Sequence, residues 1–182
     1  MKNLIVLLLI VLFTFSCKKD NSTSKVRTLR VPENVSTIQD AINKANNHDT
    51  VLVSKGTYEE NINFNGKGVY LTSVYYRTLD TLDIKNTVIK GKSGSVVTFE
   101  NKEDSTSVID GLMITYGSPQ YGSGTLQTHL QGGGIYCDSG SVKGINLKIR
   151  NNVCGGINGG GAINAENSKL YMQNCKVYGT VH

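Results

Sequence analysis

Several motifs that signal common chemistries are missing from this sequence. It contains no tryptophan, no Cys-x-x-Cys pair and no His-Glu-x-x-His motif, and its three histidines are scattered (His48, His129, His182). A zinc site is therefore not expected. The chain has no Gly-x-Ser-x-Gly turn and no phosphate-binding P-loop, which excludes the enzymes that depend on them. No arginine-rich run or basic stretch with interleaved aromatics indicates nucleic-acid binding.

Two similar glycine-rich stretches stand out instead, Gly132-Gly133-Gly134-Ile135-Tyr136-Cys137 and Gly159-Gly160-Gly161-Ala162-Ile163-Asn164. A second pair, Asn146-Leu147-Lys148-Ile149 and Asn174-Cys175-Lys176-Val177, follows with the same spacing to within one residue. A fixed period of this length indicates a repeat architecture. Each unit holds short strand-like runs that cannot bury an apolar face alone but can do so when stacked on a neighbour.

The repeat predicts one coil of a parallel β-helix. Two apolar columns are expected, Leu112–Leu147–Cys175 and Ile114–Ile149–Val177, if residues 117–131 loop out of the coil. In each round, the residue just before the first column is Gly111, Asn146 or Asn174. Glycine and asparagine tolerate the left-handed backbone of a sharp corner. A loop-rich β-sandwich is the alternative, but sandwiches do not repeat at a fixed period.

The beginning of the chain has the pattern of a targeting segment. A lysine precedes the apolar run Leu4–Phe13, which is too short to span a bilayer. Thr14-Phe15-Ser16-Cys17 resembles the lipobox of bacterial lipoproteins, in which the cysteine becomes lipidated. We therefore expect a signal peptide over 1–16, a lipidated tether over 17–28, and a location in the cell envelope, anchored to the outer membrane through Cys17. Plain secretion is the alternative.

The remaining charge is mildly basic. Removing residues 1–16 takes away one lysine and lowers the formal net charge from +5 to +4. Residues 132–182 hold five basic and two acidic side chains. This bias fits either a weak preference for acidic polymers or an ordinary solvated surface, and the second interpretation is favoured.

Three cysteines remain after Cys17, namely Cys137, Cys154 and Cys175. One disulfide with one free thiol, or burial of all three as small apolar residues, would fit. Cys175 lies in a predicted inward column, so we expect it to be buried.

A helix is predicted after Val35. Ser36 and Gln39 have the spacing of a capping box, and Ile38, Ala41, Ile42 and Ala45 form one apolar stripe. Such a helix suits the open end of a coil stack, which would otherwise expose strand edges and core. The segments 51–53, 62–64, 69–71, 87–89, 96–99 and 108–115 are the strands expected to follow, with Gly56 in a turn.

This region carries a family resemblance. Ser36–Ile42, Asp49–Val53 and Gly56–Glu60 together resemble the opening of the pectin-lyase-like superfamily, whose members are right-handed parallel β-helices and often act on polysaccharides. The Gly-Gly-Gly-Ile-Tyr and Asn-x-Cys-x-Val elements resemble repeats of bacterial β-helix surface proteins. The resemblance implies an all-β fold: a short right-handed parallel β-helix of about five coils over 29–182 with an N-terminal capping α-helix. We expect the C-terminal end of this domain to be incomplete.

The acidic residues do not define an active site. Asp110, Asp138 and Glu166 are evenly spaced along the chain, and some lyases of this fold bind Ca²⁺ on stacked carboxylates with a nearby Arg or Lys as base, a role open here to Lys148, Arg150 or Lys176. Asp110 precedes a corner while Asp138 follows a strand, so only Asp138 and Glu166 are expected to stack. They are weak candidates for a cation, and solvated turn acids are the favoured interpretation. No catalytic residue and no other cofactor is predicted.

Tyrosines are the better functional signal. Tyr116, Tyr121 and Tyr136 are candidates for stacking on sugars, although tyrosine is also an ordinary strand residue. The favoured hypothesis is a lipid-anchored module that binds polysaccharide or acts as an adhesin. The alternative is a polysaccharide lyase or carbohydrate esterase whose catalytic coils are absent or lie beyond residue 182. Expected partners are a cell-surface glycan, the membrane, and a second copy at an open C-terminal edge.

Overall fold

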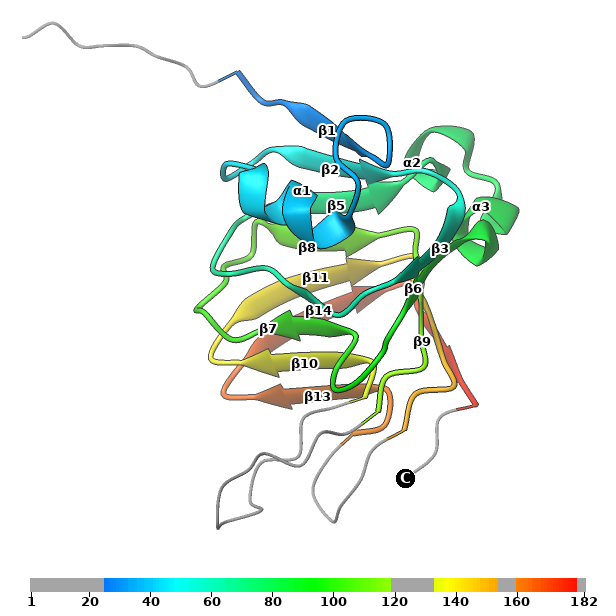
Figure 1. The fold of residues 1–182 in the computed structure, drawn as a ribbon. Coiled ribbons are helices and arrows are strands. Elements are labelled where there is room, and N and C mark those ends of the chain that lie inside the picture. Colours follow the sequence, from blue (N-terminus) through cyan, green and yellow to red (C-terminus); the bar gives the residue numbers. More distant parts are fainter. Residues whose placement is uncertain (1–24, 119–132, 154–159, 180–182) are drawn as a thin grey trace, which may run out of the picture.

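A computed structural model describes residues 25–118, 133–153 and 160–179 (Figure 1). Within these ranges the chain is mostly β, and the paired strands form three sheets in which every strand runs parallel to its neighbours. Sheet A has the order β1 (Thr28–Val31), β2 (Thr50–Val53), β5 (Tyr70–Ser73), β8 (Ser107–Asp110), β11 (Ser141–Ile145), β14 (Lys169–Gln173). Sheet B has the order β3 (Gly56–Glu59), β6 (Thr87–Lys90), β9 (Met113–Thr115), β12 (Lys148–Arg150), β15 (Lys176–Tyr178). Sheet C has the order β4 (Ile62–Asn63), β7 (Val97–Phe99), β10 (Ile135–Asp138), β13 (Ile163–Glu166).

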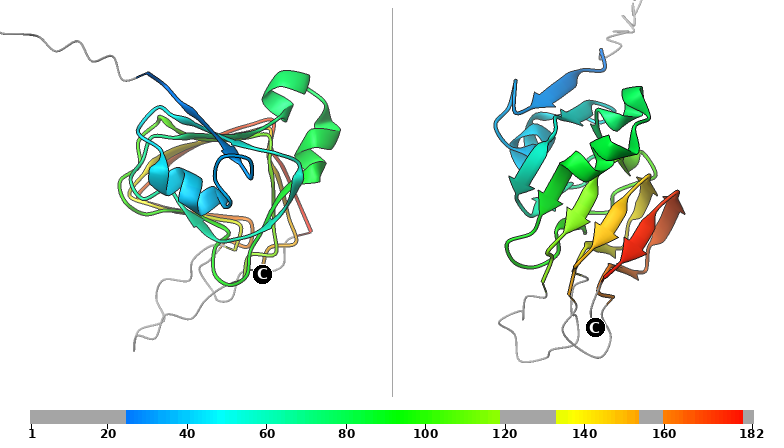
Figure 2. Two further views of the ribbon diagram at one scale, coloured as in Figure 1. Left: turned by 45° about the horizontal axis from the view of Figure 1, so that its top comes forward. Right: turned by 90° about the vertical axis from the view of Figure 1, so that its right-hand side faces the viewer.

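The chain visits the three sheets in fixed rotation. From β2 onward, successive strands belong to sheets A, B and C in turn, and each pairs with the strand that occupies the same place one round later. Figure 2 (left) shows the three sheets enclosing a common interior. This arrangement is the one that the repeat predicts for a parallel β-helix, since every strand hydrogen-bonds to a strand of the next repeat.

The predicted columns are in register. Ile114 pairs with Ile149, and Ile149 pairs with Val177. The backbone N–H of Lys148 donates to the Leu112 carbonyl at 3.0 Å, and that of Lys176 donates to the Leu147 carbonyl at 2.8 Å. The two steps of each column differ in length along the chain. The strand pairing shows that each step nevertheless corresponds to one round.

The predicted corners adopt the expected backbone. Gly111, Asn146 and Asn174 have φ values of 67°, 52° and 53°, in the left-handed region. These three residues stand between sheet A and sheet B in successive rounds. The Asn174 amide also donates to the Asn146 side-chain oxygen at 3.3 Å, so the corner is bonded from round to round.

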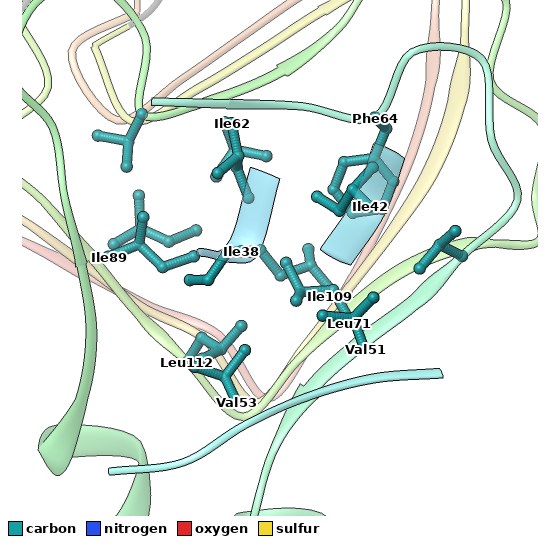
Figure 3. Close-up of a cluster of buried hydrophobic side chains, with 14 of the residues drawn as sticks. Ile38, Ile42, Val51, Val53, Ile62, Phe64, Leu71, Ile89, Ile109 and Leu112 are labelled. Carbon is teal, nitrogen blue, oxygen red and sulfur yellow. The ribbon is translucent and has the colours of Figure 1, made fainter. Parts of the chain in front are cut away.

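A single apolar cluster fills the interior (Figure 3). Phe64 and Phe99 from neighbouring rounds stack with ring centroids 4.3 Å apart, and the isoleucines and leucines of all three sheets close around them. Ile38 and Ile42 of helix α1 (Ile38–Lys44) point into the same cluster. The predicted stripe is confirmed, because Ile38, Ala41, Ile42 and Ala45 are all buried.

The prediction of Ser36 as the N-cap is wrong by one residue. The cap is Thr37, whose hydroxyl accepts from the Asp40 N–H at 3.1 Å. The Glu60 carboxylate accepts from the Ile38 and Gln39 N–H groups, both at 3.0 Å, which places the first turn at Ile38. The Gln39 side chain bonds to the backbone of Asn63 instead of closing a capping box.

Other differences from the sequence predictions are local. Gly56 begins strand β3 and is not in a turn, and β1 and the helices α2 (Tyr75–Thr78) and α3 (Thr81–Asn86) were not predicted. Cys137 is buried as a free thiol, but Cys175 is only half-buried, because it lies at the corner between β14 and β15, and each of these strands has a neighbour on one side alone among the described residues. Cys154 lies outside the described residues.

Candidate ligand-binding face

The outer face of sheet B carries two rows of side chains. Tyr58, Ile89, Ile114, Ile149 and Val177 form the inward row, and the residues on either side of them point outward because side chains alternate along a strand. The first outward row is Thr57, Val88, Met113, Lys148, Lys176. The second is Glu59, Lys90, Thr115, Arg150, Tyr178. We call these two rows the outer face of sheet B.

This face is basic. It holds four cationic side chains, and its one carboxylate, Glu59, is already paired with the Lys90 ammonium at 2.8 Å. The ion pair lowers the pKa of Glu59 and raises that of Lys90. Lys148, Arg150 and Lys176 have no carboxylate beside them in either row. The face therefore has a positive field available to a ligand.

A hollow of about 540 Å³ opens on this face beside Tyr116. We call it the Tyr116 hollow. Val88 and Met113 supply apolar surface, while Thr57, Thr115, Lys90 and Arg150 supply polar groups. An apolar wall with a few convergent polar groups is the usual composition of a small-molecule or sugar site.

Tyr116 is held in an uncommon backbone conformation. Its φ is 58°, and the residues at the same corner in the next two rounds are Asn151 and Gly179, also left-handed. Asparagine and glycine adopt this conformation readily, whereas a bulky side chain there is an outlier. The residue is 55 % exposed, with the Lys90 ammonium 5.6 Å from its ring centroid. The corner thus presents an aromatic ring where its equivalents place small polar residues.

Thr115 adds a second exceptional feature. It is 4 % exposed, it lines the Tyr116 hollow, and its hydroxyl has no hydrogen-bond partner among the described residues. A buried hydroxyl without a partner costs about 1–3 kcal/mol. Rotation of the Thr115 side chain about χ1 would turn the hydroxyl toward the hollow, where a ligand hydroxyl would remove that cost.

Arg150 and Tyr178 extend the site along the second row. The Arg150 guanidinium lies 5.7 Å from the Tyr178 ring centroid, and Tyr178 is partly exposed. Lys90, Tyr116 and Arg150 thus line the hollow itself, and Tyr178 lies next to it through its cation–aromatic contact with Arg150.

The predicted tyrosines are not equivalent. Tyr116 lies at the hollow, Tyr121 is outside the described residues, and Tyr136 lies in β10 of sheet C between Thr98 and Asn164. Tyr136 is 6 % exposed, so its ring offers little surface for stacking. Burial, with the Glu166, Asp138 and Glu100 carboxylates, raises its pKa to about 12.

The acidic candidates lie away from the basic face. Asp138 pairs with Glu166 across β10 and β13 in sheet C, as expected, whereas Asp110 ends β8 in sheet A. The Asp110 carboxylate accepts from the Tyr70 hydroxyl and from the Asn146 amide, at 2.5 and 2.8 Å. Within the described ranges, no three His, Cys, Asp or Glu side chains are placed to hold a metal ion.

Comparison with known proteins identifies no relative. No family model, no curated protein and no solved structure matches this chain. In the part of the chain that the structure describes, no helix has the length and apolar character needed to cross a membrane. Cys17 lies outside that part.

Sequence reasoning named Tyr116 as a sugar contact and Lys148, Arg150 and Lys176 as possible bases, but it did not place them on one face. Lys148 and Lys176 occupy equivalent places in the two Asn-x-Lys-x elements, so their stacking could have been read from the repeat. The alignment of Thr57, Lys90 and Thr115 could not, because the steps between paired residues of their strands are 31 and 25 residues long and α2 and α3 lie within the first of them.

Proposed function

We propose that the outer face of sheet B binds a polysaccharide, with one sugar seated in the Tyr116 hollow. The observation that carries the proposal is the buried, unpartnered Thr115 hydroxyl in the wall of that hollow. A sugar offers hydroxyl groups that can both donate and accept hydrogen bonds, and one of them would pair with the Thr115 hydroxyl once that side chain turns toward the hollow.

Two further features support the proposal. The exposed Tyr116 ring, kept at a left-handed corner at an energetic cost, fits a residue retained for contact with a ligand. Val88 and Met113 give the apolar C–H faces of a sugar a surface to pack against. A strand role alone would not require a tyrosine at this corner.

The finer architecture belongs to the same proposal. We infer a right-handed β-helix of the pectin-lyase-like kind with about five coils, in which α1 closes the end nearest β1. The chain would be attached through a lipid on Cys17 to the outer membrane of a bacterium, with the outer face of sheet B open to envelope or surface glycans. Replacement of Cys17 by serine should leave the precursor uncleaved and change its partition between membrane and soluble fractions.

Binding is favoured over lyase chemistry by where the charges lie. The stacked carboxylates Asp138 and Glu166 belong to sheet C, whereas Lys148, Arg150 and Lys176 belong to sheet B. A metal-assisted elimination needs the cation and the base on the same sugar. These residues are not brought together.

The test uses the full chain in detergent, applied to an array of neutral and acidic polysaccharides and then titrated with any glycan that binds. Tyr116→Asn removes the ring but keeps a residue suited to the corner, as at Asn151. We expect binding to weaken about tenfold or more, equivalent to about 1.4 kcal/mol, while the free energy of unfolding stays the same or rises.

Thr115→Val is the second variant, since it removes the hydroxyl and keeps the shape. It should weaken glycan binding without destabilising the fold, because the hydroxyl has no protein partner to lose. Tyr171→Ala, at an exposed tyrosine of β14 in sheet A, is the control and should bind as the unchanged chain does. Absence of any glycan ligand, or unaltered binding by both variants, would overturn the proposal.

A further inference from the structure

Helices α2 and α3 form an insertion between β5 and β6 that lies against the outside of sheet B (Figures 1 and 2). A second hollow, of about 380 Å³, opens between α3 and the ends of β12 and β15. We call it the α3 hollow. Its wall includes Lys85 from α3, Lys148 from β12 and Lys176 from β15, with Asn146 and Asn174 beside them. No carboxylate of the described residues lines it.

The three lysines are forced together by the fold. Lys148 and Lys176 are direct partners across β12 and β15, a position at which two like charges repel. The insertion brings Lys85 to the same hollow. Burial, together with the charges of Lys85 and Lys176, lowers the pKa of Lys148. The pKa shift is a sign that the positive charges in the hollow are poorly compensated.

The nearby carboxylates are engaged elsewhere. Asp110 accepts hydrogen bonds from Tyr70 and Asn146. Asp83 of α3 pairs with Lys55 at 2.5 Å, which lowers the pKa of the Asp83 carboxyl. Asp80 caps α3 by accepting from the Leu82 N–H. None of these side chains lines the α3 hollow.

We infer that the α3 hollow is a binding site for an oxyanion, that is, a carboxylate, sulfate or phosphate group. Three lysines that line one hollow from three separate elements supply charge-assisted donors for such a group. An oxyanion among them replaces repulsion by attraction. The same chemistry can come from a free ion or from a charged substituent on a larger ligand, and the experiment separates the two.

The site is independent of the proposed glycan binding but lies next to it. Lys148 of the α3 hollow and Arg150 of the Tyr116 hollow are two residues apart on β12, which corresponds to about 7 Å along a strand. A polymer with acidic sugars could therefore occupy both hollows, whereas a free ion would occupy the α3 hollow alone.

The experiment measures how fast each lysine of the full chain reacts with an amine-acylating reagent, read by mass spectrometry. Sodium sulfate, phosphate, glucuronate and glucose are added in parallel at constant ionic strength, set with sodium chloride. Lys85, Lys148 and Lys176 should react about threefold or more slowly with the three anions and at the original rate with glucose. Lys143, on the outer side of β11, is the internal control and should not change.

The variants Lys85→Gln and Lys176→Gln should each remove the protection of Lys148. Lys148 itself is left in place, because its ammonium donates to the Thr81 carbonyl at 3.2 Å and helps to hold α3. Lys143→Gln should leave the protection intact. Equal protection of all lysines, or protection that survives Lys85→Gln and Lys176→Gln, would overturn the inference.

The outcomes also separate this site from the proposed function. Tyr116→Asn should weaken glycan binding about tenfold or more and leave the protection by sulfate unchanged. Protection of the three lysines by a free ion, with no glycan bound, supports an ion site alone. Protection by acidic but not by neutral polysaccharide shows that the oxyanion is a charged substituent of the polymer. Failure of all anions to protect, with glycan binding preserved, would overturn the oxyanion site and leave the glycan proposal standing.

Discussion

Near β1, the inward side chains are completely covered: Val31, Val51 and Val53 have no exposed surface, and α1 packs on them. Near β14 and β15, equivalent side chains remain partly open. Leu170 and Met172 are half-buried, and Val177 is 50 % exposed although its column partner Ile149 is fully buried. Burial in this fold therefore depends on whether a strand or a helix covers the residue from both sides, as α1 does at β1, and not on the residue type.

The largest expected effect on the free energy of unfolding comes from substitutions at two positions of the same inward column, one buried and one exposed. Ile149→Ala should lower the free energy of unfolding by about 2–5 kcal/mol, because it leaves a cavity at a fully buried position between two neighbouring rounds. Val177→Ala should cost about 1 kcal/mol or less, because half of that residue is already in water. Equilibrium urea unfolding of both variants tests this, and equal losses would contradict the comparison.

The next effect concerns the covered end. Thr37→Ala should lower stability by about 1 kcal/mol, because the Asp40 N–H loses its acceptor. Ser36→Ala is the matched control at the adjacent hydroxyl residue, and it should stay within about 0.5 kcal/mol of the unchanged chain. The same urea measurements apply, and a larger loss for Ser36→Ala than for Thr37→Ala would return the cap to Ser36.

A pH effect is expected at the same end. Burial raises the pKa of Asp49, but hydrogen bonds from Asn46 and Arg27 and the Arg27 guanidinium, 2.7 Å away, outweigh it and hold that pKa below its usual range. A lowered folded-state pKa contributes stability above the unfolded pKa, near about 3.9, which is lost as the pH falls through the folded value.

Asp49→Asn should therefore lower stability at neutral pH and flatten its decline below about pH 4. Asp40→Asn, at an exposed carboxylate of α1, is the control and should keep the full decline. Urea midpoints measured from strongly acidic to neutral pH decide between them. An unchanged pH profile in Asp49→Asn would show that this contact does not link stability to pH.

The smallest expected effect is association at the open end. Among the described residues, β13, β14 and β15 each pair with one neighbour only, and such strand edges can pair with another chain. The full chain in detergent should self-associate weakly as its concentration rises. Tyr171→Lys, which places a charge on exposed β14, should reduce this association. Sedimentation across a wide concentration range is the test, and a monomer throughout would show that the edge is protected.

Much of the fold was predictable because the repeat reports backbone geometry directly. A glycine or asparagine at a fixed place marks a left-handed corner, as at Gly111, Asn146 and Asn174, and the apolar pair that follows marks a strand. The stripe of α1 was predictable for the same reason, since its spacing follows the helical turn. The choice of Thr37 over Ser36 was not, because it depends on Glu60, a residue of the first round of strands.

Gly144 shows where local patterns fail. A glycine inside a strand usually suggests a turn or a bulge, yet Gly144 is a buried strand position in β11. An added Cβ would lie 2.6 Å from the sulfur of Met172, its partner one round later. The residue is small because the Met172 side chain occupies the space above it, and no feature within β11 itself reports that contact.

The repeat, the inward columns, the corners and the apolar stripe of α1 could be read from the sequence, because corners and stripes depend on residues close together in the chain and the repeat returns them from round to round. Which outward side chains share a surface depends on the tertiary structure. Lys90, Thr115 and Arg150 meet at one hollow, and Lys85, Lys148 and Lys176 at another, through parallel pairing across connections of unequal length. A period in the sequence cannot place those residues together, since insertions between strands change the spacing while strand pairing preserves the register.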